Sequence, residues 1–181
     1  MKKINGGWIL YKAQPDVGMK NGGLIEDPKQ RLEYLNKIDP KKELCHDDLF
    51  FYYKFRGLAN EELNREEEAI RNYSDALKNI VVSKKVTKND IKQIYIWRGN
   101  LFEKISDSES AMSDYVSANK LDEKKRTALF EIACLLIKQK KYSEARKVID
   151  DILNKYSQEE YFEEYIKREC KKLQDTIKNE S

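Results

Sequence analysis

The sequence predicts an all-α protein built from consecutive helix pairs. Glycine and proline are scarce, with 7 and 3 among 181 residues, and 37% of the residues are charged. An average soluble domain has about 25% charged residues, so this composition is typical of long, solvent-exposed helices. A fixed spacing of small and large residues also recurs three times along the chain. The length favours a single hydrophobic core, which we expect over residues 28–181.

Residues 1–27 are predicted to form an irregular N-terminal arm. Five glycines and one proline interrupt this segment around a single apolar patch, Trp8-Ile9-Leu10-Tyr11. Such frequent interruption excludes a long helix and leaves room for one short strand. The basic start reaches Lys12 before any sufficient apolar stretch, so we do not expect a signal peptide.

A short helix is predicted directly after the arm. Asp27 is a good helix cap, Pro28 suits the first helical position, and Asp39-Pro40 should end the helix. Apolar residues follow at intervals of three, at Leu32, Leu35 and Ile38.

From residue 47 onward the chain is predicted to be helical, with breaks near 64–65, 83–89, 106–108, 121–122, 140–141 and 156–157. Two of the new starts carry a capping box, in which a hydroxyl and a carboxylate three residues apart can cap each other's backbone amides. These are Thr87 with Asp90 and Ser157 with Glu160. Helices should therefore begin near residues 88 and 158.

The internal repeat has five positions with the same offsets in each copy. They are Tyr53, Gly57, Ala69, Tyr73 and Ala76; then Tyr95, Gly99, Ala111, Tyr115 and Ala118; then Leu129, Ala133, Ala145, Ile149 and Ile152. The small residues predict places where two antiparallel helices cross closely, with Ala69, Ala111 and Ala145 opposite the first-helix small residues. The large residues one turn later should cover the space beyond the crossing.

This pattern resembles the tetratricopeptide repeat, with the form W-x2-L-G-x2-Y, then A-x3-F, then proline, over roughly residues 50–156. Gly57 and Gly99 match its glycine, and Ala69-x3-Tyr73 and Ala111-x3-Tyr115 match its second element. The resemblance implies a right-handed α-α superhelix with repeats at about 50–83, 92–122 and 126–156. The closing proline is absent, and Arg56, Arg98 and Asn60 depart from the family pattern.

The spacing of the copies predicts two further features. Ala111 and Ala145 are 34 residues apart, whereas Ala69 and Ala111 are 42 apart. We expect the extra residues to extend the second helix of the first pair through Ile80 to Val82, giving a protruding helix or a longer loop. The amphipathic segment 158–179 should be a C-terminal capping helix, and the helix after Pro28 should close the other end. The apolar positions of the C-terminal segment are Tyr161, Tyr165, Cys170, Leu173 and Ile177.

In the family that this sequence resembles, the first helix of each pair lines a concave groove, which implies a partner-binding site here. The positions flanking the small residues are Phe51, Lys54, Leu58, Gln93, Ile96, Asn100, Thr127, Phe130 and Cys134. Their apolar centre predicts a groove for a peptide or a helix of another protein. Alternatively, the N-terminal arm could fill the groove with its own apolar patch. Resemblance to members that clamp a terminal carboxylate is not supported, because Phe130, Glu131 and Cys134 stand where basic residues should be.

Motifs for catalysis are not found. The chain has one histidine, His46, and no phosphate-binding glycine loop, HExxH or nucleophile elbow. His46 beside Cys45 lacks two further metal ligands nearby, so it is expected to start a helix. We therefore expect no enzymatic activity, no cofactor and no metal.

Charge and cysteine content restrict the class of partner. The 35 basic and 32 acidic residues are interleaved, which disfavours nucleic-acid binding. No apolar stretch is long enough to cross a membrane, and three widely spaced cysteines favour a reducing cytoplasm. The predicted function is an adaptor that binds a partner protein or peptide. An immunity protein that neutralises a toxin and a secretion-type chaperone remain alternatives, and the oligomeric state stays open.

Overall fold

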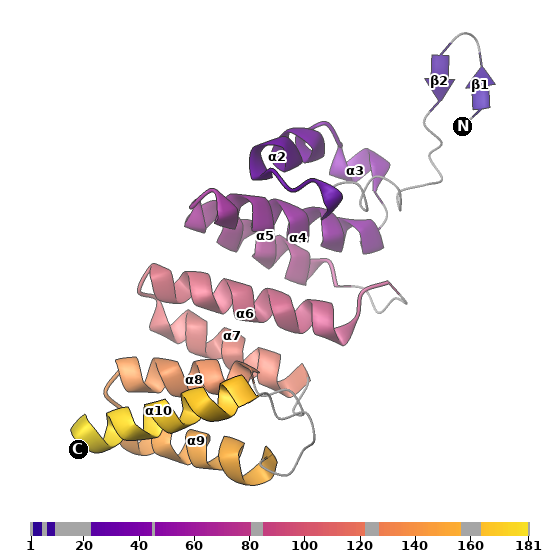
Figure 1. The fold of residues 1–181 in the computed structure, drawn as a ribbon. Helices are drawn as coiled ribbons and strands as arrows, with labels where there is room; N and C mark the ends of the chain where they lie inside the picture. Colours follow the sequence, from indigo (N-terminus) through magenta and orange to yellow (C-terminus); the bar gives the residue numbers. More distant parts are fainter. Residues whose placement is uncertain are drawn as a thin grey trace. The chain divides into compact units, whose positions relative to one another are not determined.

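The computed structural model describes residues 2–4, 7–9, 23–44, 46–80, 85–121, 127–156 and 164–180 (Figure 1). A small hairpin is formed by β1 (Lys2–Ile4) and β2 (Gly7–Ile9). The helices are α2 (Pro28–Asn36), α3 (Pro40–Glu43), α4 (His46–Glu62), α5 (Glu66–Lys78), α6 (Lys88–Lys104), α7 (Ser108–Leu121), α8 (Thr127–Lys138), α9 (Tyr142–Tyr156) and α10 (Glu164–Glu180). The predicted all-α fold class is confirmed.

Two compact units make up the chain, Met1–Ile94 and Tyr95–Ser181. The division falls within helix α6. The prediction of one domain over residues 28–181 stays a prediction.

The N-terminal arm contains two short strands, where the sequence suggested one. Strands β1 and β2 pair antiparallel, with Lys2 opposite Ile9 and Lys3 opposite Trp8. The remainder of the arm before Gly23 lies outside the described residues.

Helix α2 begins as predicted and packs against α4 in the first unit. The carboxylate of Asp27 accepts a hydrogen bond of 2.7 Å from the backbone amide of Gln30, which caps the helix. The fully buried Leu35 packs with Tyr52 of α4. Arg31 adds an ion pair of 2.9 Å to Glu62 at the end of α4. Burial of one apolar side of α2 therefore fixes it on α4.

The Asp39-Pro40 pair starts a second short helix, α3, which the sequence reading missed. The Asp39 carboxylate accepts a 3.1 Å hydrogen bond from the Lys41 amide, and Glu43 accepts a 2.9 Å bond from the Asp39 amide. These reciprocal bonds form a capping arrangement, so proline here occupies the first turn of a helix and does not only end the preceding one.

Helices α4 and α5 form the first helical hairpin, with Gly57 under the ring of Tyr73. A Cβ atom placed on Gly57 would lie 2.3 Å from Cε1 of Tyr73, far closer than van der Waals contact. Gly99 of α6 is covered in the same way by Tyr115 of α7, at 2.6 Å. The predicted close approach is therefore present, but the nearest group is the tyrosine ring and not Ala69 or Ala111.

The predicted extension of the second helix of the first pair is wrong. Helix α5 ends at Lys78, and the amide of Asn79 closes it by donating to the carbonyls of Ala76 and Asp75. Residues 81–84 lie outside the described part of the chain. Part of the extra length is in α6 itself, which has 17 residues against 12 in α8.

Helix α6 begins at Lys88, as its capping box predicted. The Thr87 hydroxyl accepts a bond of 3.1 Å from the Asp90 amide, and Asp90 accepts a bond of 3.1 Å from the Thr87 amide. These two bonds satisfy amides that have no partner within the helix.

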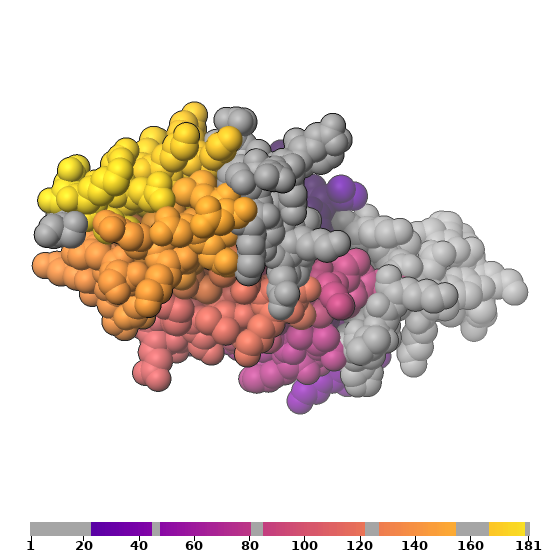
Figure 2. Space-filling model, turned by 90° about the horizontal axis from the view of Figure 1, so that it is seen from below, coloured from indigo at the N-terminus to yellow at the C-terminus, as the bar shows by residue number. Residues whose placement is uncertain are grey.

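The second unit has a continuous apolar core under the capping helix α10. Ala133, Ala145, Ile149 and Ile152 are fully buried in one cluster with Cys170 and Ile177 of α10. Helix α10 packs against α9 and α8, and Figure 2 shows it lying directly on their surface. The predicted capping helix is confirmed over 164–180, whereas the second predicted capping box lies outside the described residues.

Each helical hairpin turns through a residue with positive φ. Asn64, Ser106 and Lys140 have φ values of 54°, 65° and 61° and hold the same place in the repeat register. After each of them, the next amide donates to a carbonyl five residues earlier, as Arg65 does to Asn60. This is the Schellman end of a helix, repeated three times.

Candidate partner-binding pocket

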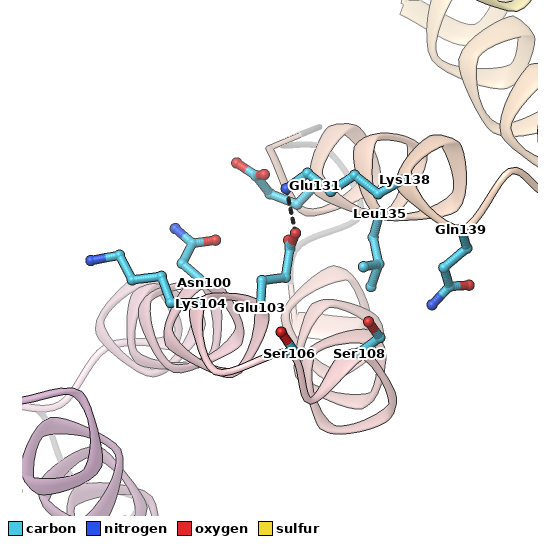
Figure 3. A pocket seen from close by; sticks show the side chains of 9 residues that line it. All are labelled: Asn100, Glu103, Lys104, Ser106, Ser108, Glu131, Leu135, Lys138 and Gln139. Atoms are coloured by element: carbon cyan, nitrogen blue, oxygen red, sulfur yellow. Dashed lines mark hydrogen bonds and ion pairs between the residues drawn. The ribbon is translucent and has the colours of Figure 1, made fainter.

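A pocket of about 450 Å³ opens in the second unit between helices α6 and α8 (Figure 3). Ser106 in the turn before α7, Ser108 at the start of α7 and the end of α8 complete its wall. The lining residues are Asn100, Glu103, Lys104, Ser106, Ser108, Glu131, Leu135, Lys138 and Gln139. The lining is mostly polar, with acidic and basic groups side by side.

Glu103 is the most tightly held of the charged groups. The hydroxyl of Tyr115 on α7 lies 2.6 Å from Glu103 Oε1 and 2.7 Å from Asn100 Oδ1, and its single proton can be donated to one of these two acceptors at a time. The second carboxylate oxygen of Glu103 pairs with Nζ of Lys138 on α8. This hydrogen-bonded pair raises the pKa of Lys138 and keeps it charged. Glu103 is thus neutralised within the pocket.

Glu131 differs from Glu103 because no described residue forms an ion pair or hydrogen bond with its carboxylate. It projects from α8, two turns before Lys138, and is half-buried. Burial, followed by repulsion from Glu103, raises the pKa of Glu131 above its ordinary value of 4.5. Removing a charge from water without giving it a partner is costly.

Gln139 also has an unpaired acceptor at the pocket. Its Oε1 atom is buried, and no described residue donates a hydrogen bond to it. Buried side-chain acceptors are almost always paired in folded proteins. The pocket therefore has two acceptors, on Glu131 and Gln139, that no described donor satisfies.

These two residues also break the pattern of the internal repeat. The positions equivalent to Glu131 are Phe55 and Trp97, and those equivalent to Gln139 are Leu63 and Ile105. A polar residue thus replaces an apolar one twice in the third copy, and both replacements line the pocket. The sequence analysis named Glu131 only as a departure from the carboxylate-clamp pattern and did not name Gln139; comparing these two positions across the three copies reveals both.

Only one of the nine predicted site residues, Asn100, lines this pocket. Thr127 is exposed in the first turn of α8, and Ile96 is half-buried on α6. Phe130 packs against the apolar core of the second unit. Cys134 is half-buried, and burial raises the pKa of its thiol to about 12.

The other four predicted residues lie in the first unit. Phe51 packs against Phe50 and Phe55, with ring centroids 5.3 and 6.3 Å away. The ammonium group of Lys54 is 2.7 Å from Asp90, and the side chain is largely buried, so it offers a partner little surface. Leu58 and Gln93 are half-buried. A single groove that unites all nine residues stays a prediction.

Two further expectations concern residues at the margins of the described structure. Within the described ranges, no cluster of three or more histidine, cysteine or acidic side chains could hold a metal ion, and no helix has the length and apolar character needed to cross a membrane. Cys45 and the side chain of His46 lie outside those ranges, although α4 does begin at His46 as expected. Of the apolar patch of the arm, Trp8 and Ile9 lie in β2, whereas Leu10 and Tyr11 lie outside the described ranges, so the predicted place of the patch in the groove is untested.

No protein-family model matches the sequence, and no curated protein matches it at a significant level.

Proposed function

We propose that this protein is a non-enzymatic interaction module that binds a segment of a partner protein on the first helices of its helix pairs, as tetratricopeptide-repeat proteins do. The observation that carries the proposal is the pocket between α6 and α8, because these are the first helices of the second and third pairs. Pockets that bind chain segments combine an apolar floor with a few fixed polar groups, and here Leu135 and the fixed Asn100 and Glu103 have those roles. The right-handed superhelix belongs to the same proposal.

Several properties favour binding over catalysis. The thiol of Cys134, the cysteine nearest to the pocket in sequence, has a raised pKa, which makes it a poor nucleophile. Glu103 is neutralised by Lys138, so it is a weak candidate for a general base. The described groups thus favour recognition of another molecule over its chemical conversion.

The composition favours a protein partner in a reducing compartment. Acidic and basic residues are nearly balanced, so the chain lacks the strong positive field that collects nucleic acids. Cys134 and Cys170 are free thiols, as is usual for cytoplasmic proteins.

Site-specific photocrosslinking tests this proposal. A photoreactive phenylalanine at Lys104, exposed at the pocket rim on α6, should crosslink a partner in host-cell extract. The same group at Lys147, exposed on the second helix α9, is the matched control and should not. A partner crosslinked from position 147 but not from 104 would contradict the proposal. Phe51 and Phe130 are unsuitable sites for this test because they pack against apolar clusters.

A further inference from the structure

Some polar groups of the pocket have hydrogen-bond or ion-pair partners among the described residues, and others have none. Glu103 has Lys138 and Tyr115 as partners, whereas Glu131 and the Oε1 atom of Gln139 have no donor among the described residues. Lys104 is exposed at the rim and forms no ion pair with any described side chain. Lys138 attracts Glu131 electrostatically but forms its ion pair with Glu103, so the carboxylate of Glu131 is left without a directly bonded cation among the described residues.

The repeat register shows that these acceptors are not demanded by the fold. Phe55 and Trp97 fill the position of Glu131 in the first two copies, and Leu63 and Ile105 fill that of Gln139. The first two copies thus fold with apolar side chains at both positions, although Ile105 itself is exposed. Two polar residues thus stand at repeat positions that are apolar in the other copies, and both line the same pocket. Such departures from a local pattern are expected at functional sites.

We propose that this pocket binds a basic side chain, arginine or lysine, carried by the partner segment, with Glu131 as its ion-pair acceptor. The inference rests on the proposed function and specifies its partner. A guanidinium group fits best because it supplies several planar donors and can bind a carboxylate through two parallel hydrogen bonds. Lys138 can stay on Glu103 while the incoming cation pairs with Glu131.

An acidic guest fits the same pocket poorly. Its carboxylate would approach the carboxylate of Glu131, which has no ion pair among the described residues, and like charges brought close together at an interface repel each other. The two lysines do not reverse this balance, because Lys138 already pairs with Glu103 and Lys104 is exposed to solvent.

Titration with N-acetylarginine amide, followed by NMR of the backbone amides, tests the inference directly. We expect millimolar binding, as suits one isolated side chain, with shifts at Ser106, Leu135 and Gln139. N-acetylcitrulline amide, which has the same shape without the charge, should bind at least five-fold more weakly. The carboxyl pKa of Glu131 should fall when arginine amide saturates the pocket, because a nearby positive charge favours the ionised form.

The variant Glu131→Gln keeps the shape of the side chain and removes its charge, so it should weaken arginine-amide binding at least five-fold. Glu144→Gln removes an exposed charge from α9 and should leave binding unchanged. Equal binding by Glu131→Gln and the parent, or equal binding of the citrulline compound, would overturn the inference.

The inference and the proposed function can fail separately. A partner that crosslinks from position 104 and keeps its affinity for Glu131→Gln would overturn the basic-side-chain inference and leave the interaction module standing. Specific binding of arginine amide at Glu131, with crosslinks from position 147 alone, would overturn the proposed binding face and leave the pocket's preference intact.

Discussion

At the scale of single residues, pairs of side chains that interact in the first two copies of the repeat are both replaced in the third copy. The hydroxyl of Tyr73 donates to Glu61 at 2.6 Å, and Tyr115 with Glu103 repeats this pair. The third copy has Ile149 and Ile137 at the two equivalent positions. The polar pair is thus replaced as a unit, which avoids leaving a carboxylate or a buried hydroxyl without its partner.

The arginines that depart from the family pattern have the same explanation. Arg98 binds Asp114 through two hydrogen bonds of 2.7 and 2.6 Å, although Asp114 is almost fully buried. Burial raises the pKa of Asp114, and the arginine opposes that shift. Arg56 contacts Asn72 at the equivalent positions of the first copy. In the third copy, Ile132 and Val148 stand there, so an apolar pair replaces the ionic one.

The close contact at Gly57 predicts a destabilising Gly57→Ala substitution. Alanine is the better helix former by about 1 kcal/mol, but its methyl group would overlap the Tyr73 ring, and overpacking costs about 1–3 kcal/mol. The penalty should largely disappear in the Tyr73→Ile background, which copies the Ala133 and Ile149 pair. Urea unfolding of the parent, the two single variants and the double variant measures this coupling, and additive effects would contradict the packing argument.

Replacing the buried ion pair predicts a second coupled effect. Arg98→Ile alone should destabilise the second unit by about 3 kcal/mol or more, because it leaves Asp114 buried without its partner. Adding Asp114→Val should recover most of that loss, since the third copy folds with Ile132 and Val148. Thermal unfolding of both single variants and the double variant gives the coupling energy. A double variant no more stable than Arg98→Ile would show that the apolar pair cannot substitute here.

At the scale of elements, the hairpin turns determine where each first helix ends. Each turn places one residue in the left-handed region, which costs most L-residues about 1–2 kcal/mol, whereas glycine adopts it freely and asparagine with little cost. Asn64 tolerates this conformation, whereas Ser106 and Lys140 hold it against their preference. The left-handed conformation at these turns is therefore imposed by the hairpin lengths and by the packing of the two helices, and not by the preference of the turn residue.

This geometry predicts that Lys140→Gly stabilises the second unit by about 0.5–1 kcal/mol, because glycine adopts positive φ without steric cost. Asn64→Gly should stabilise the first unit by less, because asparagine already tolerates positive φ. Lys141→Gly, one position further along and outside the set of positive-φ residues, is the control and should bring no gain. Chemical denaturation measures all three, and a destabilised Lys140→Gly variant would contradict the assignment of this turn.

At the scale of the molecule, the chain has two compact units, and the second holds the candidate pocket above a continuous apolar core. Helix α10 covers that core, with Cys170 and Ile177 almost completely buried against it. A short array of helix pairs leaves its last apolar face open unless another element covers it. Helix α10 therefore shields the apolar core of the second unit from solvent.

Truncation of the capping contact should therefore weaken the whole second unit. Ile177→Ala should cost about 2–4 kcal/mol, as is typical for a buried aliphatic residue reduced to alanine. Thr176→Ala, at the neighbouring exposed position, should cost much less. Hydrogen exchange of the α8 and α9 amides provides the measurement. Unchanged protection in Ile177→Ala would show that α10 does not stabilise these helices.

Local signals in the sequence determined the helical class, the repeat register and several helix starts. Asp27 with Pro28, and Thr87 with Asp90, act through bonds within one turn, so neighbouring residues suffice to predict them. The end of α5 was missed because the apolar residues from Ile80 to Val82 continue the helical pattern, whereas the chain leaves the helix at Asn79. The periodicity of apolar residues alone cannot reveal that a helix ends where the apolar pattern continues.

The pocket was decided by tertiary structure. Glu103 and Lys138 are 35 residues apart, and only the packing of α8 against the α6–α7 hairpin brings them together. The sequence analysis named Asn100, which lines the pocket, but it could not show which charges would be paired and which would not. Pairing depends on distances across helices, and those distances exist only once the helices have packed.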